Sequence, residues 1–241
     1  MFSKSAHFYD ALYSWKDYPA EAKVLHGLIV DAAPGARTLL DVACGTGAHL
    51  EHLAAFFEVS GLDLDPELLA LARERVPEAT LYVGDMRSFD LERRFGAVTC
   101  MFSSIGYVRE VSRLADAVKA MASHLEPGGV LILEPWFGAD EFDDGRTDEL
   151  EARDGDLQIK RIAFSRKEGS LSFVDFRYEV RRGDGPLETF TEEHVMGLFS
   201  DDEYRNAIRG AGLELLAFDP EGPTGRGLYV ANDPSSGSRG L

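Results

Sequence analysis

A glycine-rich loop near the start of the chain constrains the fold more than any other feature. A short apolar run at residues 38–42 leads into the segment Asp41-Val42-Ala43-Cys44-Gly45-Thr46-Gly47, and a helical pattern follows at residues 48–57. Glycine lets a backbone approach a ligand where a Cβ atom would collide. The first turn of the following helix presents unpaired N–H groups and the positive end of its dipole. A strand, a glycine loop and a helix in this order predict a nucleotide-type ligand at the carboxyl end of a parallel strand.

Strand and helix patterns alternate through the first half of the chain. Apolar runs predict strands at residues 38–42, 58–62, 80–83, 97–102 and 130–134. Apolar spacing predicts helices at residues 20–33, 48–57 and 110–125. Asp65 and Pro66 begin a further helix as its N-cap and first residue. We therefore expect an α/β fold, a doubly wound Rossmann-like sheet covered by helices on both faces.

The second half of the chain changes character. Residues 137–156 are acidic and contain glycine, which predicts a surface loop or lid, and residues 158–199 show three strand-like runs with hairpin turns. A helix at residues 201–210 and strands at 213–218 and 227–230 complete the pattern. We expect a sheet finished by an antiparallel edge strand, with an antiparallel β layer inserted after the fifth strand. The predicted units are a core of residues 1–136 and 200–231, an inserted substrate-side layer of residues 137–199, and a flexible tail of residues 232–241.

The formal charge of −17 excludes several classes of partner. An acidic surface repels nucleic acids and anionic membranes, although a few local arginines can still bind a small anion. No apolar run approaches the roughly 20 residues that span a bilayer, and the first residues lack the apolar core of a secretory signal. The two cysteines, Cys44 and Cys100, form no Cys-x-x-Cys or His/Cys cluster, so we expect reduced thiols, no metal and a cytoplasmic protein.

Acidic residues after two further strands suit a nucleoside ligand. Asp63 follows the second predicted strand, where a carboxylate can accept both ribose hydroxyls. Asp85 ends the third strand and can accept the adenine amino group, while Met86 packs on the ring. A dinucleotide fingerprint needs a third glycine for close helix packing, but Leu50 occupies that position. The pattern therefore favours a nucleoside without a pyrophosphate over NAD(P).

These motifs resemble those of class I S-adenosylmethionine-dependent methyltransferases. They are the loop at residues 41–47, Gly61-Leu62-Asp63, Gly84-Asp85-Met86 and Leu125-Glu126-Pro127-Gly128-Gly129. The usual loop of that class reads acidic-x-G-x-G-x-G, and Ala43 replaces its first glycine here. The resemblance implies a class I methyltransferase sheet and S-adenosyl-L-methionine as methyl donor.

A narrower resemblance covers nearly the whole chain. It is carried by Lys16-Asp17-Tyr18, the glycine loop with His49-Leu50, Gly84-Asp85-Met86-Arg87, Met101-Phe102-Ser103-Ser104-Ile105-Gly106, Glu134-Pro135-Trp136 and the segment from Gly222 to Leu228. These segments are similar to the nucleotide-linked amino-sugar N-methyltransferases of the desosamine and mycaminose type. Such enzymes dimethylate the amine of TDP-linked deoxyamino sugars in antibiotic biosynthesis. The resemblance implies a TDP-amino sugar as substrate and, by analogy alone, a homodimer.

The site residues follow from the loop and from these resemblances. The expected donor contacts are Tyr9, Tyr18, Asp41, Ala43, Gly45, Gly47, Asp63, Leu64, Asp85, Met86 and Met101. The expected substrate contacts are Ser103, Trp136, Arg177, Tyr178 and Arg226, with Arg226 as first choice for the diphosphate. The catalytic candidates are Tyr107, where the family has a His or Tyr near the amine, Glu134 and His194. The family also has a tyrosine eight residues before the position of Tyr9, but this chain has Met1 there.

Methyl transfer from a sulfonium is an in-line displacement by an unprotonated amine. We expect alignment and a dry site to do most of the work, with no single residue indispensable. Two other functions stay open: methylation of another small O, C or N acceptor, and non-catalytic binding of S-adenosylmethionine. Several candidates also have a purely structural interpretation. These are Tyr9, Tyr18 and Trp136 as packing aromatics, Met86 and Met101 as core residues, Glu134 as a sheet-end hydrogen-bond partner and His194 as a surface histidine.

Overall fold

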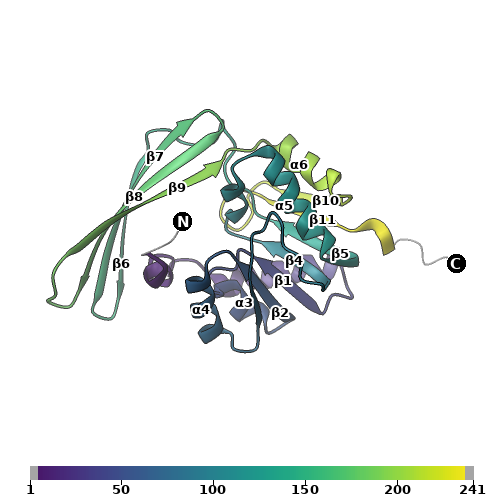
Figure 1. Cartoon of the computed structure of the whole chain (residues 1–241), viewed down its shortest axis with the longest axis horizontal. Helices are drawn as coiled ribbons and strands as arrows, with labels where there is room; N and C mark the ends of the chain where they lie inside the picture. Colours follow the sequence, from purple (N-terminus) through teal and green to yellow (C-terminus); the bar gives the residue numbers. More distant parts are fainter. Residues whose placement is uncertain (1–4, 237–241) are drawn as a thin grey trace.

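Seven strands form the larger of two sheets in the computed structural model, which describes residues 5–236 (Figure 1). They are β1 (Thr38–Val42), β2 (Glu58–Asp63), β3 (Thr80–Val83), β4 (Phe95–Cys100), β5 (Leu125–Leu133), β10 (Glu214–Asp219) and β11 (Leu228–Asn232). Their order is β10-β11-β5-β4-β1-β2-β3, and β1 to β5 are parallel. The chain runs outward from β1 through β2 to β3 and then crosses to β4. The strand order therefore reverses between β1 and β4, where ligands bind in sheets of this kind.

One detail of the predicted sheet is wrong. We expected an antiparallel strand at its edge, but the antiparallel strand β11 lies inside the sheet, between β5 and β10. The edge strand is β10, which pairs with β11 alone. The chain returns from β10 as a hairpin, and β11 takes the place beside β5.

Helices cover both faces of this sheet, as predicted. The helices are α1 (Tyr9–Leu12), α2 (Tyr18–Ala32), α3 (Ala48–Leu53), α4 (Pro66–Arg75), α5 (Val111–Ser123) and α6 (Asp201–Gly210), with 3-10 turns η1 (Ser5–Phe8), η2 (Ser104–Val108) and η3 (Pro234–Ser236). One core lies under α5 and α6, and a second lies under α2 and α3. Alternate residues of a strand face opposite cores, as Leu39 and Leu40 do on β1. Every residue of β4 is buried, as expected of a strand covered on both faces.

Side-chain caps fix where three helices begin. Asp17 accepts from the backbone of Ala20 at the start of α2, and Asp65 accepts from Glu67 at the start of α4. Ser200 and Glu203 form a reciprocal capping box on α6. The predicted cap at Asp65 is therefore present, whereas α3 ends at Leu53, before the predicted residue 57.

Four antiparallel strands form the second sheet. They are β6 (Thr147–Asp154), β7 (Leu157–Glu168), β8 (Leu171–Arg182) and β9 (Glu188–Gly197), paired in that order. The sheet extends away from the core, and η1 and α1 lie between the two sheets in Figure 1. Leu12 of α1 packs with Leu157 and Tyr178 of the second sheet.

The first strand of this sheet was not predicted. We expected a loop at residues 137–156, but β6 pairs along its whole length with β7. Its sequence is mostly charged because it is an edge strand with exposed side chains, and only Leu150 and Ala152 pack on the core. Pairing with β7 therefore outweighs its low intrinsic strand preference.

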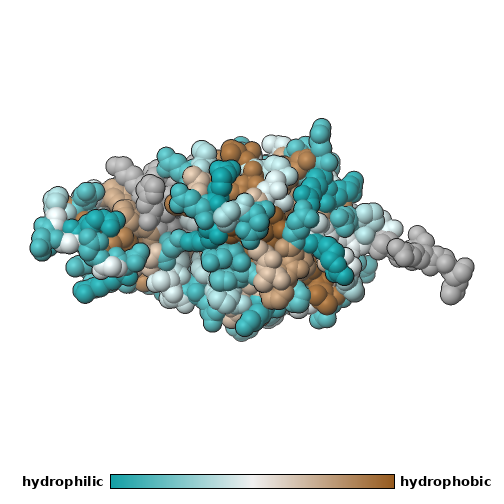
Figure 2. All heavy atoms as spheres, turned by 90° about the horizontal axis from the view of Figure 1, so that it is seen from below, coloured by the Kyte–Doolittle hydropathy of each residue, from teal (hydrophilic) through white to brown (hydrophobic). Residues whose placement is uncertain are grey.

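The surface of the molecule is largely hydrophilic on the face seen in Figure 2, where apolar patches are broken up by polar residues. Within residues 5–236, no helix is long and apolar enough to cross a membrane. Two predictions concern residues that the structure does not describe. One is the end of the predicted flexible tail, residues 237–241, and the other is Met1, which stands where the family has a tyrosine.

Candidate active site

The glycine loop turns sharply because three of its residues have left-handed backbone angles. The φ values are 59° at Ala43, 56° at Gly45 and 77° at Gly47. A Cβ atom at Gly47 would lie only 3.1 Å from the Cβ of Ala72, so α3 and α4 pack closely at this point. The departure at Ala43 from the usual glycine therefore leaves the loop geometry intact, with a non-glycine residue held at positive φ.

Asp63 ties this loop to the end of β2. Its Oδ2 accepts from the backbone N of Gly45 at 2.8 Å, and its Oδ1 accepts from the backbone N of Asp65 at 2.9 Å. The residue is buried, and burial raises the pKa of the carboxyl above its ordinary value. Each carboxylate oxygen retains capacity for a second donor. Asp63 can therefore accept hydroxyl groups from a ligand while it holds the loop.

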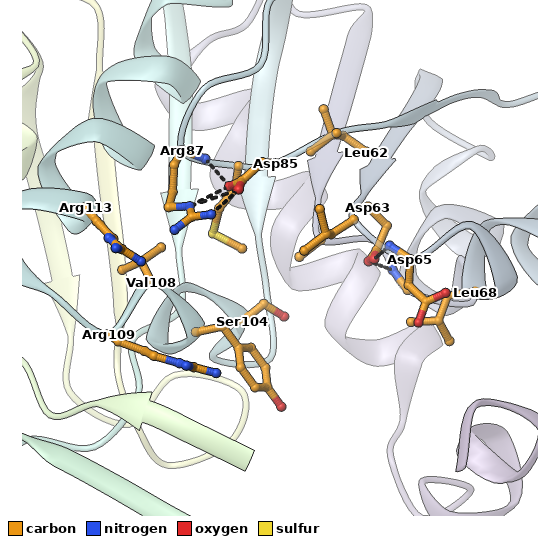
Figure 3. A pocket seen from close by; sticks show the side chains of 16 residues that line it. Leu62, Asp63, Asp65, Leu68, Asp85, Arg87, Ser104, Val108, Arg109 and Arg113 are labelled. Carbon is orange, nitrogen blue, oxygen red and sulfur yellow. Dashed lines mark hydrogen bonds and ion pairs between the residues drawn. The ribbon is translucent and has the colours of Figure 1, made fainter. Parts of the chain in front are cut away.

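A cavity of about 390 Å³, here called the donor cavity, opens between Asp63 and Asp85 (Figure 3). The two carboxylates project from the ends of β2 and β3, and Leu64, Met86 and Tyr107 also line the space. Arg87 donates from its Nε to Asp85 Oδ1 at 2.8 Å. This pair holds the pKa of Asp85 below its ordinary value. The cavity thus has an ionised carboxylate at one end and apolar walls for a flat ring.

A small cavity of about 30 Å³ adjoins the loop, and Tyr18, Asp41, Ala43, Gly45 and Met101 help to line it. Ala43 and Gly45 also line the donor cavity, so the two spaces meet at the loop. Apart from Tyr9 and Gly47, all predicted donor contacts line one or both of these cavities. The side chain of Tyr9 lies outside the described part of the chain, and Gly47 caps α3.

Asp41 is a buried carboxyl at the end of β1. The Thr99 hydroxyl donates to its Oδ1 at 2.8 Å. Burial dominates and raises the pKa of Asp41 to about 6.

The raised pKa of Asp41 makes the free energy of unfolding depend on pH. The folded state binds the proton more tightly than the unfolded chain, so the protonated form stabilises at low pH and this contribution is lost as pH rises through about 6. Asp41→Asn keeps an acceptor for Thr99 but removes the charge. From pH 4 to pH 7, we expect the variant to gain about 2 kcal/mol of unfolding free energy relative to wild type. Urea unfolding at both pH values measures this change. The exposed Asp116→Asn is the control, and equal pH dependence in Asp41→Asn and wild type would show that Asp41 titrates normally.

A third cavity of about 370 Å³, the acceptor cavity, lies between the two sheets. Tyr107, Trp136, His194 and Arg226 line it. Ser104 lines all three cavities, and Tyr107 lines both the donor and the acceptor cavity. These two residues of η2, beyond the end of β4, therefore mark the passage between the cavities.

Arg226 presents a guanidinium to the acceptor cavity without a carboxylate partner. Its Nη1 donates to Ser103 Oγ at 3.2 Å and to Thr224 Oγ1 at 3.3 Å, and its ring neighbours are Trp136, Phe102 and Phe137. No carboxylate of the described residues lies within ion-pair distance, and its Nε is buried with no hydrogen-bond partner among those residues. Burial lowers the pKa of the group. A partly buried cation of this kind is ready to bind an anion.

Glu134 and Ser103 support this arginine from behind and do not line the acceptor cavity. The Glu134 carboxylate is fully buried, accepts from the backbone N of Phe102 at 2.7 Å and is hydrogen-bonded by the hydroxyl of Thr224. Ser103 donates to the carbonyl of Pro135 at 2.6 Å. The sheet-end interpretation of Glu134 fits these contacts better than a catalytic role.

Tyr107 and His194 meet at the wall of the acceptor cavity. The Tyr107 hydroxyl lies 2.6 Å from Nδ1 of His194, which β9 holds in a buried position. Burial lowers the pKa of His194, so the imidazole is neutral near pH 7. The structure therefore joins two of the three catalytic candidates, from elements far apart in the sequence.

Besides Ser103, two predicted substrate residues do not line the acceptor cavity. Arg177 is on the outer face of β8, with a side chain that is 60% exposed and paired with Glu179 at 3.0 Å. Tyr178 points inward but is buried against Leu12 and stacks on Phe190. The alternation of β8 places Arg177 on the face opposite to Val174 and Phe176, which line the cavity. Tyr178 shares their face but lies further along the strand, where it packs on Leu12.

Arg161 lines the acceptor cavity from β7 and was not among the predicted site residues. Its Nη1 donates to the hydroxyl of Tyr13 at 3.0 Å, and its guanidinium lies over the ring of Phe176. Within residues 5–236, no carboxylate forms an ion pair with it. Nothing in the sequence distinguishes this arginine from the solvated arginines of neighbouring strands, since only the register of β7 turns it inward.

Comparison with known proteins agrees with this geometry. A family model described as "Methyltransferase domain" matches residues 39–129. The chain is 42% identical to the dTDP-3-amino-3,4,6-trideoxy-alpha-D-glucopyranose N,N-dimethyltransferase of Streptomyces venezuelae, over 93% of this chain and 96% of the relative. It is 42% identical to the dTDP-3-amino-3,6-dideoxy-alpha-D-glucopyranose N,N-dimethyltransferase of Streptomyces fradiae, over 93% and 89%.

Solved structures give the same result. The crystal structure of DesVI from Streptomyces venezuelae superposes with a TM-score of 0.91 at 40% identity, covering 96% of this chain and 99% of that one. A SAM-bound amino pentose methyltransferase from Micromonospora echinaspora has a TM-score of 0.86 at 39% identity, covering 97% and 98%.

Proposed function

Because the chain belongs to the family of nucleotide-linked amino-sugar N-methyltransferases, which use S-adenosylmethionine, we propose that it dimethylates the amine of a TDP-linked deoxyamino sugar in natural-product biosynthesis. One observation carries the proposal. The unpaired guanidinium of Arg226 faces a cavity that meets the donor cavity at Ser104 and Tyr107. An anionic acceptor can therefore be anchored at one end while its amine reaches the donor.

The residues of the donor cavity fit S-adenosylmethionine. Asp63 offers acceptors for two ribose hydroxyls, Asp85 offers one for an adenine amine, and Met86 offers an apolar surface. The left-handed turn at Gly45 brings backbone close to the ligand where a Cβ atom would stand. The bound donor supplies an activated methyl group on a sulfonium. The chain's own residues need only hold the two partners in line and exclude water.

Two arginines of the acceptor cavity suit a nucleoside diphosphate, although Glu141, Asp143 and Asp148 also line it. In a protein with a net charge of −17, Arg226 and Arg161 both face this cavity without a carboxylate partner among the described residues. They project from different sheets, Arg226 from the β10–β11 loop and Arg161 from β7. Guanidinium groups bind phosphate oxygens bidentately. Trp136 and Phe176 provide apolar walls for the sugar.

The reaction depends on an amine without its extra proton. Apolar walls such as Trp136, Phe176 and Met196 disfavour the charged ammonium and so favour the reactive form. Tyr107 lies at the passage, where its hydroxyl can hydrogen-bond to the amine. Alignment of the amine with the methyl group of the donor in this passage is the main catalytic contribution. We place the reaction in the cytoplasm, in keeping with the two unpaired, buried cysteines Cys44 and Cys100. The homodimer stays a prediction.

Incubation with labelled S-adenosylmethionine and a panel of TDP-amino sugars tests this function. We expect transfer of two methyl groups to the nitrogen of at least one member, identified by mass spectrometry. The same sugars without TDP should react poorly, because they lack the anion that Arg226 binds. A chain that binds the donor but methylates no sugar amine would have another acceptor or would be a non-catalytic binder.

A further inference from the structure

A buried line of polar groups runs from the start of the chain to the passage between the cavities. Ser5 donates from its backbone N to Glu192 Oε1 at 3.0 Å and from its hydroxyl to Glu192 Oε2 at 2.6 Å. Oε2 of Glu192 lies 3.7 Å from Nε2 of His194, and Nδ1 of His194 lies 2.6 Å from the Tyr107 hydroxyl. Three separate elements, η1, β9 and η2, therefore meet through four side chains.

Glu192 is the residue of this line whose burial is least favourable. Its side chain is only 3% exposed, and burial of a carboxylate is unfavourable unless hydrogen bonds and charges compensate it. The neighbouring Glu193 on β9 points the other way and forms an ordinary surface ion pair with Arg166. A hydrophobic residue at position 192 would fill an inward position of β9 with no such cost. The buried carboxylate therefore calls for a role beyond packing.

The carboxylate determines which nitrogen of His194 carries the proton. A negative charge near Nε2 attracts a proton to that nitrogen and leaves Nδ1 as an acceptor. The Tyr107 hydroxyl then donates to Nδ1, so the lone pairs of its oxygen are left for a group in the passage. In the opposite tautomer, Nδ1 would donate to Tyr107 and the hydroxyl proton would point elsewhere.

We infer that Glu192 is a positioning residue that fixes the His194 tautomer, so that the Tyr107–His194 pair accepts the proton that the substrate nitrogen must lose between its two methyl transfers. The inference rests on the proposed function, since only dimethylation needs such a step. Two methyl groups cannot be added to one amine unless the first product, a secondary ammonium, is deprotonated in between.

The proton step balances without any further reagent. After the first transfer, the substrate nitrogen is an ammonium that carries one methyl group and two protons. One of these protons passes to the Tyr107 oxygen as the Tyr107 hydroxyl proton passes to Nδ1 of His194. The products are a neutral secondary amine, a neutral tyrosine and an imidazolium beside the Glu192 carboxylate. No group is oxidised or reduced, and the imidazolium later releases its proton to water.

The groups around His194 keep its imidazole neutral near pH 7, so that Nδ1 can accept a proton. Burial is the largest effect and lowers the pKa of His194, Glu192 on the same strand opposes this shift, and the charge of Arg161 on β7 adds to it. Phe176 on β8 packs edge-on against the imidazole, with 4.9 Å between the ring centroids, and contributes no charge. Tyr107 on η2 is a titratable group in direct contact with His194, and burial keeps its hydroxyl protonated by raising its pKa.

Nitrogen-15 NMR of the imidazole and product analysis test the inference together. In the full-length wild type, we expect the proton on Nε2 of His194, and in Glu192→Gln we expect it on Nδ1, because the amide that replaces the carboxylate can donate to Nε2. With a TDP-amino sugar and S-adenosylmethionine, Glu192→Gln should accumulate monomethyl product, since its second transfer slows by roughly tenfold or more relative to its first. The wild-type ratio of second to first transfer should rise with pH as His194 becomes neutral, and the variant should lose this dependence.

Glu193→Gln is the matched control, because it removes a carboxylate from the next position of the same strand, and it should leave tautomer and product ratio unchanged. Ser5→Ala, which removes one donor to Glu192, should give a smaller change in the same direction if Glu192→Gln fails to fold. An unchanged tautomer, or equal slowing of both transfers, would overturn the inference and leave Glu192 as an anchor for the start of the chain. If the wild type methylates no sugar amine, the proposed function fails, and with it the proton step, while the tautomer measurement still decides whether Glu192 positions His194.

Discussion

Replacing Arg226 by methionine raises the KM for the nucleotide sugar by roughly 30- to 3,000-fold, corresponding to about 2–5 kcal/mol for loss of one member of a partly desolvated charge pair. The reason is the isolation of this guanidinium, which has hydroxyl and aromatic neighbours but no carboxylate partner among the described residues. The diphosphate supplies its counter-charge. Methionine preserves most of the side-chain length and the contact with Trp136, so packing changes little.

Steady-state kinetics and donor titration separate this effect from a general loss of structure. The dissociation constant of S-adenosylmethionine should stay within about twofold, because Arg226 does not line the donor cavity. Arg226→Lys should recover only part of the affinity, since a lysine cannot bind phosphate bidentately or stack in the same way. Arg177→Met, on the outer face of β8, is the matched control and should behave as wild type. A KM that is equal in both methionine variants would remove Arg226 from the acceptor site.

The donor half of the site could be predicted from the sequence because local segments encode it. The loop residues Gly45 and Gly47 are close in the chain, and Asp63 and Asp85 each end a predicted parallel strand. The carboxyl ends of such strands meet at one edge of the sheet, so the residues that follow these strands lie close together. The structure adds a reason why Leu50 is tolerated where a dinucleotide fold has glycine. Gly61 on β2 packs directly against Leu50, and a Cβ there would lie 2.8 Å from its Cδ1.

The acceptor half could be predicted only in part because it depends on the register of distant strands. Arg226 and Trp136 lie in segments with local markers, and both reach the cavity as expected. Arg177 was predicted to reach it but Arg161 does so, because a one-residue difference in strand position reverses the face that a side chain occupies. The strand β6 was missed for a related reason, since an edge strand needs little apolar sequence of its own.

Asp63 should be the most sensitive residue of the donor cavity. Asp63→Asn is expected to weaken S-adenosylmethionine binding by at least roughly 10- to 100-fold, since a hydrogen bond to a charged acceptor is worth about 1.5–3 kcal/mol and the amide keeps at most one of the two. The same change disturbs the loop, because an amide nitrogen must then face one of the two backbone N–H groups, of Gly45 or Asp65, that the carboxylate now satisfies. Stability should fall less than donor affinity, because burial raises the pKa of Asp63 and the neutral amide removes an unfavourable buried charge.

Calorimetric titration with S-adenosylmethionine and with its demethylated product measures the affinity of Asp63→Asn, and urea unfolding at the same pH measures its stability. Asp65→Asn is the matched control, since asparagine caps a helix as well as aspartate does and the backbone N of residue 65 still donates to Asp63. Both ligands should lose affinity equally in Asp63→Asn, because the ribose is common to them and the methyl group lies elsewhere. Wild-type affinity in this variant would mean that Asp63 serves only to hold the glycine loop and that the ribose is bound by another group of the donor cavity.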